Sequence, residues 1–345
     1  MIDHINCTLD NVCAHWVGNK NDEVIILSKE EINIEEESLR ETLISYFFSS
    51  FKSEEYYNFY HDSDLKFNEV YNYVSEIFDN TSNIFEQSVN LAKHLYEKSI
   101  HPKVKGGEFY VVYFKECFIN GKTSDCVGIF KSENKDTFLK VRSTSENFGI
   151  EAERGININK LDKGCLIFNI EKENGYIVAV VDNTNKGSEA QYWIDEFLHI
   201  KPRQDEYYNT HNVLSMCKTF VTQELPSQFD VSKADQADFL NKSVQFFKEK
   251  DSFDIKEFAN EVMAQPEVIE SFNNFKQEYE EGFGVEIMDN FNISDSAVKK
   301  QARSFKSVIK LDKNFHIYVH GDKKLIEQGQ DERGKFYKVY YNEEE

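Results

Sequence analysis

Proline is scarce in this chain of 345 residues, with four in all, and no segment has the biased composition of a low-complexity linker. The sequence therefore excludes long proline-rich or disordered linkers. Long apolar runs are also missing, and no stretch approaches the length of a membrane-spanning helix. The first residues lack the basic segment and the following apolar segment of a signal peptide. We expect a soluble, cytoplasmic protein with no membrane partner.

Cysteine is used sparingly, and none of the six cysteines forms a C-x-x-C pair. They lie mostly among apolar, strand-like residues, which indicates buried free thiols in a reducing compartment. The phosphate-binding loop GxxxxGK[ST], the nucleophile elbow GxSxG and the zinc motif HExxH are absent too. We find no persuasive catalytic constellation, and we expect neither an enzyme nor a cofactor or metal site.

Positive charge is in short supply, with 40 Lys and Arg against 61 Asp and Glu and a net charge of -21. The deficit is uneven along the chain. Residues 1–100 carry about −12 and residues 171–297 about −14, whereas residues 101–170 carry about +2 and residues 298–324 about +6. A polarised molecule can bind a polyanion through one face. The basic segment near the C-terminus is therefore the clearest functional indication.

This basic segment contains an alternating pattern typical of a β-hairpin, from Phe305 to Gly321. A three-residue loop at 312–314 places Lys310 opposite His316. Ser294 is expected to cap a preceding basic helix. Such a surface either contacts successive phosphates or is a solvated sheet face whose lysines prevent aggregation. On the first interpretation, the DNA contacts are Lys299, Lys300, Arg303, Lys306, Lys310, Lys313, His316, Tyr318, His320, Lys323 and Lys324.

The pattern of apolar residues predicts an α+β chain without βαβ repetition. Residues 1–203 are expected to form an antiparallel sheet with flanking helices. The polar run that follows Pro202 marks a boundary. Residues 204–345 are expected to form a helical region, which ends in a three-stranded β-meander completed by a strand at 335–341. We therefore expect two domains, 1–203 and 204–345.

The tetrapeptide Lys-Leu-Asp-Lys occurs twice, at 160–163 and at 310–313, each time beside an apolar strand. Similar turns that serve similar strands explain this repeat without any function. The alternative is a second basic patch, although several glutamates lie close to it in sequence. That patch would consist of Lys140, Arg142, Arg154, Lys160 and Lys163.

Three blocks of sequence resemble a known family. They are GGEFYVVYF from Gly106, GININKLDKGCLIFNI from Gly155 with the following NGYIVAVVDN and EAQYWIDEFL, and FKSVIKLDKNFHIYVHG from Phe305. Together they resemble the 37-kDa nucleoid-associated protein family, the NdpA- and YejK-like proteins, in a divergent form. The resemblance covers most of the chain. It implies a cytoplasmic, DNA-associated protein of the bacterial nucleoid that is not an enzyme.

Two function classes follow. The first is a nucleoid-associated protein that binds DNA, expected to be duplex, largely without sequence preference, because no major-groove reading module is visible. A homodimer fits this class, since paired basic faces multiply weak contacts. The second class is an acidic adaptor that docks proteins acting on DNA. A metal-dependent nuclease built on Asp162, Asp182 and Glu189 is the weakest alternative, because so many carboxylates produce such matches by chance.

Overall fold

The computed structural model describes residues 2–184, 192–305, 308–311, 313–319, 325–341 and 343. Helices and mostly antiparallel strands occur in both halves of the chain, which confirms the predicted α+β class. The chain divides into two compact units, Met1–Arg203 and Gln204–Glu345. They are named here the N-terminal unit and the C-terminal unit.

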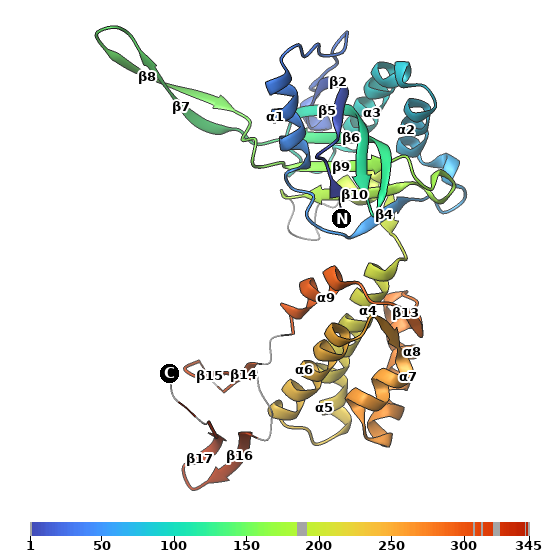
Figure 1. The fold of residues 1–345 in the computed structure, drawn as a ribbon, viewed down its shortest axis with the longest axis vertical. Coiled ribbons are helices and arrows are strands. Elements are labelled where there is room, and N and C mark those ends of the chain that lie inside the picture. Colours follow the sequence, from blue (N-terminus) through green and yellow to red (C-terminus); the bar gives the residue numbers. More distant parts are fainter. Residues whose placement is uncertain are drawn as a thin grey trace. The chain divides into compact units, whose positions relative to one another are not determined.

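A nine-stranded antiparallel sheet forms the centre of the N-terminal unit (Figure 1). Its strands follow the order β11-β4-β10-β9-β6-β5-β2-β3, and the short β1 pairs with β5. Runs of β-branched and aromatic residues favour these strands. Their bounds are β1 Ile2–Asp3, β2 Thr8–Val17, β3 Ile25–Ile26, β4 Tyr56–Phe59, β5 Gly107–Ile119, β6 Lys122–Ser132, β9 Lys163–Phe168, β10 Ile177–Asp182 and β11 Ile200–Pro202.

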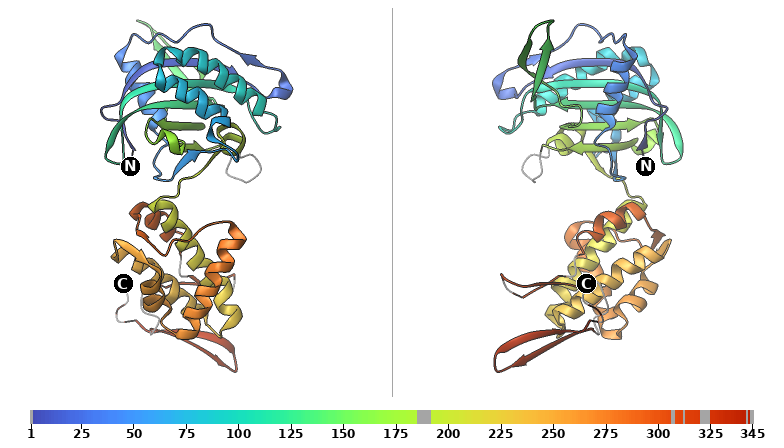
Figure 2. Two further views of the ribbon diagram at one scale, coloured as in Figure 1. Left: turned by 90° about the vertical axis from the view of Figure 1, so that its right-hand side faces the viewer. Right: turned by 60° about the vertical axis from the view of Figure 1, so that its left-hand side comes forward.

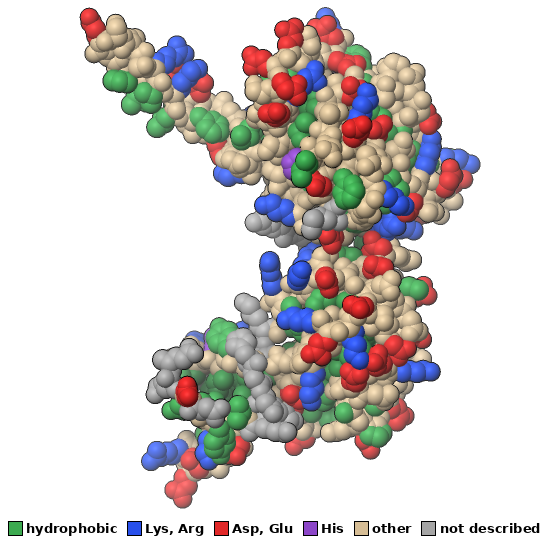
Figure 3. All heavy atoms as spheres, in the orientation of Figure 1, with side chains coloured by type: hydrophobic (Ala, Val, Ile, Leu, Met, Phe, Trp, Pro, Cys, Tyr) green, Lys and Arg blue, Asp and Glu red, His purple; other side chains and the backbone are tan. Residues whose placement is uncertain are grey.

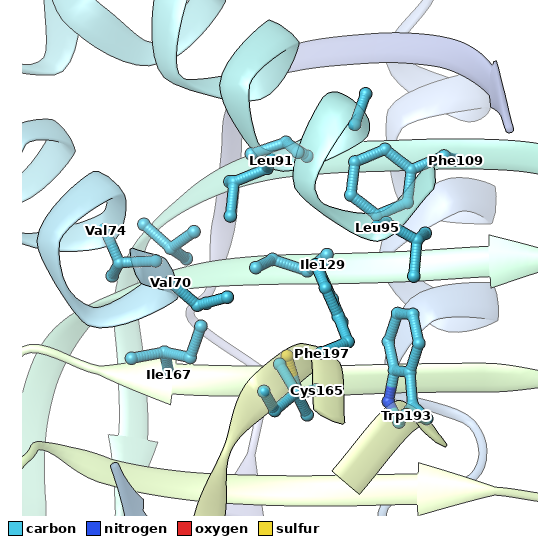
Figure 4. Close-up of a cluster of buried hydrophobic side chains, with 14 of the residues drawn as sticks. Val70, Val74, Leu91, Leu95, Phe109, Ile129, Cys165, Ile167, Trp193 and Phe197 are labelled. Carbon is cyan, nitrogen blue, oxygen red and sulfur yellow. The ribbon is translucent and has the colours of Figure 1, made fainter. Parts of the chain in front are cut away.

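Helices cover both faces of this sheet (Figure 2). The helices α2 (Glu69–Asp79) and α3 (Ile84–Lys98) pack on one face, in the apolar cluster drawn in Figure 4. The helix α1 (Glu37–Phe48) packs on the other face. Since successive strand residues point to opposite faces, Val111 belongs to the first cluster and Val112 to the second. The central strands are therefore buried on both sides and read as nearly continuous apolar runs.

A long hairpin leaves the N-terminal unit and stands away from its sheet (Figures 1 and 2). It consists of β7 (Asp136–Ser143) and β8 (Phe148–Gly155), which pair only with each other. All of its strand residues are exposed except the first and the last. We call residues 136–155 the arm.

The C-terminal unit has a helical core built around buried phenylalanines such as Phe220, Phe258 and Phe272. Local signals set the helix ends. Ser232 and Asp235 form a capping box at the start of α6, and Gly284 ends α8 in the left-handed conformation. The helices are α4 Glu206–Thr219, α5 Leu225–Gln228, α6 Lys233–Glu249, α7 Ile255–Phe258, α8 Pro266–Phe283 and α9 Asp295–Ala302, with a small sheet of β12 Ser252–Asp254 and β13 Asn290–Asn292.

The last strands differ from the predicted three-stranded meander. In the described residues they form two separate hairpins, β14 (Val308–Lys310) with β15 (His316–Tyr318), and β16 (Ile326–Asp331) with β17 (Gly334–Val339). The strand β16, whose sequence is mostly polar, gives β17 a local partner through a two-residue turn between Asp331 and Gly334. Gly334 adopts a positive φ of 128° there, which suits glycine. The predicted three-stranded meander does not form among the described residues, because β17 pairs with β16, a strand that was not predicted.

Candidate nucleic-acid interface

The helix α9 carries the first part of the predicted interface. Its N-terminus is capped by Ser294, whose hydroxyl accepts a hydrogen bond from the backbone N–H of Ala297 at 3.4 Å, as expected. Ala297 and Val298 are buried, and the amide of Gln301 lies 2.7 Å from Nδ1 of His211 on α4. These contacts fix the inner side of α9, so that its basic residues lie on the opposite, exposed side.

Lys299 and Lys300 lie in the last turn of α9, and Arg303 follows immediately. All three side chains are exposed. The Lys300 ammonium lies 5.5 Å from the ring centre of Tyr207 on α4. Cations near a helix C-terminus interact favourably with the helix dipole, so part of their placement has a structural reason.

The hairpin β14–β15 carries the second part. Lys310 faces His316, as predicted, and the N–H of Leu311 donates to the carbonyl of Phe315 at 3.0 Å. This pairing agrees with the predicted three-residue loop, of which Asp312 lies outside the described residues. Ile309 and Val319 are buried in a small cluster with Ala234 and Ala237 of α6, and this contact docks the hairpin on the helical core.

The hairpin's other side is open to solvent. Lys310, Lys313, His316 and Tyr318 are all exposed. The predicted contacts Lys306, His320, Lys323 and Lys324 lie outside the described residues. We call the seven described residues the C-terminal basic face: Lys299, Lys300, Arg303, Lys310, Lys313, His316 and Tyr318. Because α9 and β14 both pack against α6, one helix supports both parts of this face.

Four cations of this face differ from the lysines and arginines of the chain that pair with carboxylates. With respect to the described residues, Lys299, Arg303, Lys310 and Lys313 form no ion pair, whereas Lys250 contacts both Glu257 and Glu261. In the space-filling view of Figure 3, Lys and Arg side chains gather over α9 and the neighbouring part of α6. The charge of these four unpaired cations is therefore available to an anionic ligand.

The alternative second patch has a different geometry. Lys140 pairs with Glu153 at 3.0 Å, Arg142 with Glu151 at 3.1 Å and Lys160 with Asp136 at 2.9 Å. Arg154 is exposed at the base of β8. Lys163 is not a surface residue, since it is only 1% exposed and lies 2.7 Å from Asp182. This patch is largely neutralised by its own carboxylates, and Lys163 has to be removed from it.

Residues 14–344 match the family model of the nucleoid-associated protein YejK, which covers nearly the whole chain. The chain belongs to this family. Membership supports the predicted resemblance and suggests a DNA-binding role at the nucleoid. No curated protein matches the chain. The YejK family is one of nucleoid-associated proteins and is not known as an enzyme family.

Two of the carboxylates in the nuclease alternative have structural roles in this YejK-family chain. Asp162 accepts hydrogen bonds from the backbone N–H groups of Glu133 and Asn134 at 2.7 and 2.8 Å, and Asp182 holds Lys163. Glu189 lies outside the described residues. Among the residues that are described, no three His, Cys, Asp or Glu side chains are grouped so that they could hold a metal ion.

Sequence reasoning missed a second buried cation in the N-terminal unit. Lys131 is fully buried, donates to the carbonyl of Lys105 at 2.7 Å and pairs with Glu133 at 3.3 Å. Burial lowers the pKa of its ammonium. The ring of Tyr192 lies within 5.9 Å of the ammonium groups of both Lys131 and Lys163. The feature of the sequence that could have revealed this buried cation is the position of Lys131 at the end of the apolar run of β6.

Two further observations concern the cysteines and the helices. All six cysteines are free and buried, as predicted. In the part of the chain that the structure describes, no helix combines the length and apolar character needed to cross a bilayer.

Proposed function

We propose that this YejK-family chain binds duplex DNA directly through the C-terminal basic face, largely without regard to base sequence. Four exposed cations carry the proposal: Lys299, Arg303, Lys310 and Lys313 have no carboxylate partner among the described residues, in a chain of net charge -21. Cations that are free to neutralise phosphates release condensed counterions from DNA, and this release drives non-specific binding.

The two parts of the face have different tasks in this proposal. Lys299 and Arg303 are four residues apart, so they lie on one side of α9 and contact neighbouring phosphates. Lys310, Lys313 and His316 extend the contact from the hairpin, and Tyr318 hydrogen-bonds or stacks against the nucleic acid. Phosphate contacts carry no sequence information, which is why binding is expected to be general. Binding alone, without a catalytic step, is the proposed activity at the nucleoid.

The acidity of the rest of the chain supports binding of DNA through the C-terminal basic face. Asp and Glu exceed Lys and Arg by 21 in the whole chain, yet residues 298–324 have about six more basic than acidic side chains. DNA is therefore repelled by most of the surface and attracted by one part of it. A homodimer would present two such faces and raise the effective concentration of the second contact.

The test is the affinity for a duplex of random sequence, measured by fluorescence anisotropy across a salt series. The test variant carries four alanines, at Lys299, Arg303, Lys310 and Lys313. The control variant carries alanine at four lysines that pair with carboxylates, so that the net charge changes equally. These are Lys20, Lys115, Lys172 and Lys250.

Wild type and control are expected to share a steep salt dependence, and the test variant to lose about 0.9 from the slope of log affinity against log salt for each lost phosphate contact. Equal slopes in test and control would contradict the basic face. If the wild type fails to bind even at about 50 mM salt, where phosphate contacts are strong, direct binding is wrong. The acidic adaptor would then be the function to pursue.

A further inference from the structure

The arm has two chemically different sides. Directly opposed residues of an antiparallel pair share a face, so the register places Leu139, Ala152, Val141 and Ile150 on one side, with Phe148 beyond them. The other side carries the ion pairs Lys140–Glu153 and Arg142–Glu151. Figure 3 shows these sides as a row of apolar side chains along one margin of the arm and charged side chains along the other. The arm is an amphipathic ribbon.

Its apolar side is open to solvent. The exposed fractions are 73% for Leu139, 61% for Val141, 79% for Phe148 and 69% for Ile150. We call these four residues the apolar strip. An isolated two-stranded hairpin is marginally stable in water, and a continuous exposed apolar patch usually marks an interaction site. Folding of the N-terminal unit therefore does not explain why these four apolar side chains are exposed.

The base of the arm is firmly fixed to the N-terminal unit. Asp136 accepts hydrogen bonds from the side chains of Asn157 at 2.7 Å and Lys160 at 2.9 Å. Just before it, Asp162 holds the backbone N–H groups of Glu133 and Asn134. These hydrogen bonds fix the base of the arm, which lowers the entropy that is lost when a partner binds.

Charge identifies the kind of partner. The arm contains three basic and four acidic residues, so it is nearly neutral in a chain of net charge -21. Two copies of such an acidic chain repel each other over most of their surface, but hardly at all through their arms. Lys140 and Arg142 already pair with glutamates, which makes the arm a poor ligand for phosphates and anionic lipids.

We propose that the apolar strip is an interface between two copies of this chain, whose arms pack face to face about a twofold axis. Such an interface is self-complementary, because the same surface is used by both copies. Val141 and Ile150 form the central cross-strand pair of the strip, so they lie nearest to the axis and meet their counterparts. This inference goes beyond the proposed DNA binding and does not depend on it.

The available area fits a reversible dimer. Complete burial of such a side chain removes about 60–120 Å² of apolar surface at about 25 cal/mol per Å². These side chains are on average about 70% exposed, so the eight in two strips bury roughly 300–700 Å² when the arms pack together. Apolar atoms make up about two-thirds of the core of a homodimer interface, which gives a total of roughly 500–1,000 Å². This total is below that of stable specific interfaces and in the range of weak, transient ones, for which we expect dissociation constants of about 1–100 μM.

The test is sedimentation velocity of the full chain, without DNA, across a concentration series. The variant Ile150→Glu places two like charges beside the twofold axis, whereas Ser145→Glu adds the same charge at the tip of the arm, outside the strip. Wild type and Ser145→Glu should form dimers with the same affinity, and Ile150→Glu should weaken dimerisation at least about tenfold. Tryptophan fluorescence during unfolding checks that the variants remain folded.

A second measurement locates the contact. In an Ile150→Cys variant, a short bis-maleimide should link two chains, because the six native cysteines are buried. The same cysteine at position 145 should link less efficiently. A wild type that stays monomeric at about 200 μM, above the expected range, would overturn the proposal. So would an Ile150→Glu variant that dimerises like the wild type, or one that loses only DNA binding, since that result would assign the strip to DNA.

Discussion

The tetrapeptide Lys-Leu-Asp-Lys is found in two regions of the molecule with opposite surroundings. In the first copy, residues 160–163, Leu161 is 1% exposed and Lys163 is buried against Asp182. In the second, residues 310–313, Leu311 is 45% exposed and Lys313 is on the surface. The first copy leads into β9, a central strand covered on both faces, whereas the second lies at the tip of a two-stranded hairpin. The same four residues are thus structural in one place and available for binding in the other.

This difference teaches that a lysine is available to an anionic ligand only where no carboxylate neutralises its charge. Lys163 has a buried carboxylate partner that lies 19 residues further along the chain, and β9–β10 pairing brings the two together. Lys310 and Lys313 lie beyond the reach of such a partner among the described residues. Four predictions test the comparison, ordered from the largest expected effect to the smallest.

Loss of the buried lysine should have the largest effect. Lys163→Ala leaves the carboxylate of Asp182 buried without its cation, which should lower the free energy of unfolding of the N-terminal unit by about 3–5 kcal/mol. Lys313→Ala should change stability by about 0.5 kcal/mol or less. Urea unfolding measures the first effect through tryptophan fluorescence, because both tryptophans of the chain, Trp16 and Trp193, lie in this unit. Far-UV circular dichroism follows the C-terminal unit.

A compensated variant serves as the control for this prediction. Lys163→Met combined with Asp182→Leu replaces the ion pair by apolar side chains and should recover most of the lost stability. A loss below about 1 kcal/mol for Lys163→Ala would indicate that Asp182 finds another partner or is solvated.

Substitution of the two leucines should affect the free energy of unfolding in the same order, with the larger loss in the first copy. Leu161→Ala removes a side chain from the cluster beneath α1 and should cost about 2–4 kcal/mol. Leu311→Ala should cost less than about 1 kcal/mol, because the side chain is almost half exposed. The same urea experiments measure both values. Equal losses at the two positions would mean that the hairpin tip is covered in solution.

For DNA binding, in contrast to stability, substitutions in the second copy of the tetrapeptide should have the larger effect. Lys310→Ala with Lys313→Ala should reduce the slope of log affinity against log salt by about 1.8, which corresponds to two phosphate contacts. Lys140→Ala with Lys160→Ala should leave the slope unchanged, because both lysines pair with carboxylates. Anisotropy titrations with a fluorescent duplex compare the two double variants at the same net charge. A comparable loss in the second variant would restore the arm base as a DNA contact.

The smallest effect concerns Asp136 beside the first copy. Hydrogen bonds from Asn157, and then from Lys160, hold the pKa of its carboxyl below the ordinary value. A lowered pKa stabilises the folded state above the ordinary pKa, and this contribution is lost as pH falls through the lowered value. Lys160→Ala should raise the pKa of Asp136 only in part, since Asn157 remains. Carboxyl NMR titration measures this shift, and an unchanged pKa would show that Lys160 contributes nothing.

Local features of the candidate site could be predicted from the sequence. The cap at Ser294 and the pairing of Lys310 with His316 depend on residues only a few positions apart. The strand β8 was not predicted, although Phe148, Ile150 and Ala152 alternate with small or charged residues as an amphipathic strand requires. Without β8, the strand β7 had no predicted partner, so the arm could not be recognised from the sequence.

The sequence by itself determined where charge of each sign accumulates, which segments are helical or extended, and that the chain resembles the YejK family. Only the tertiary structure decided which lysines are free, because ion pairing depends on carboxylates that strand pairing brings from distant positions. Burial follows the same logic. Lys131 and Lys163 face each other across β6 and β9 and are enclosed by neighbouring elements, whereas Lys310 ends a strand of three residues with one partner. A side chain's identity is local, but its solvation is set by the whole fold.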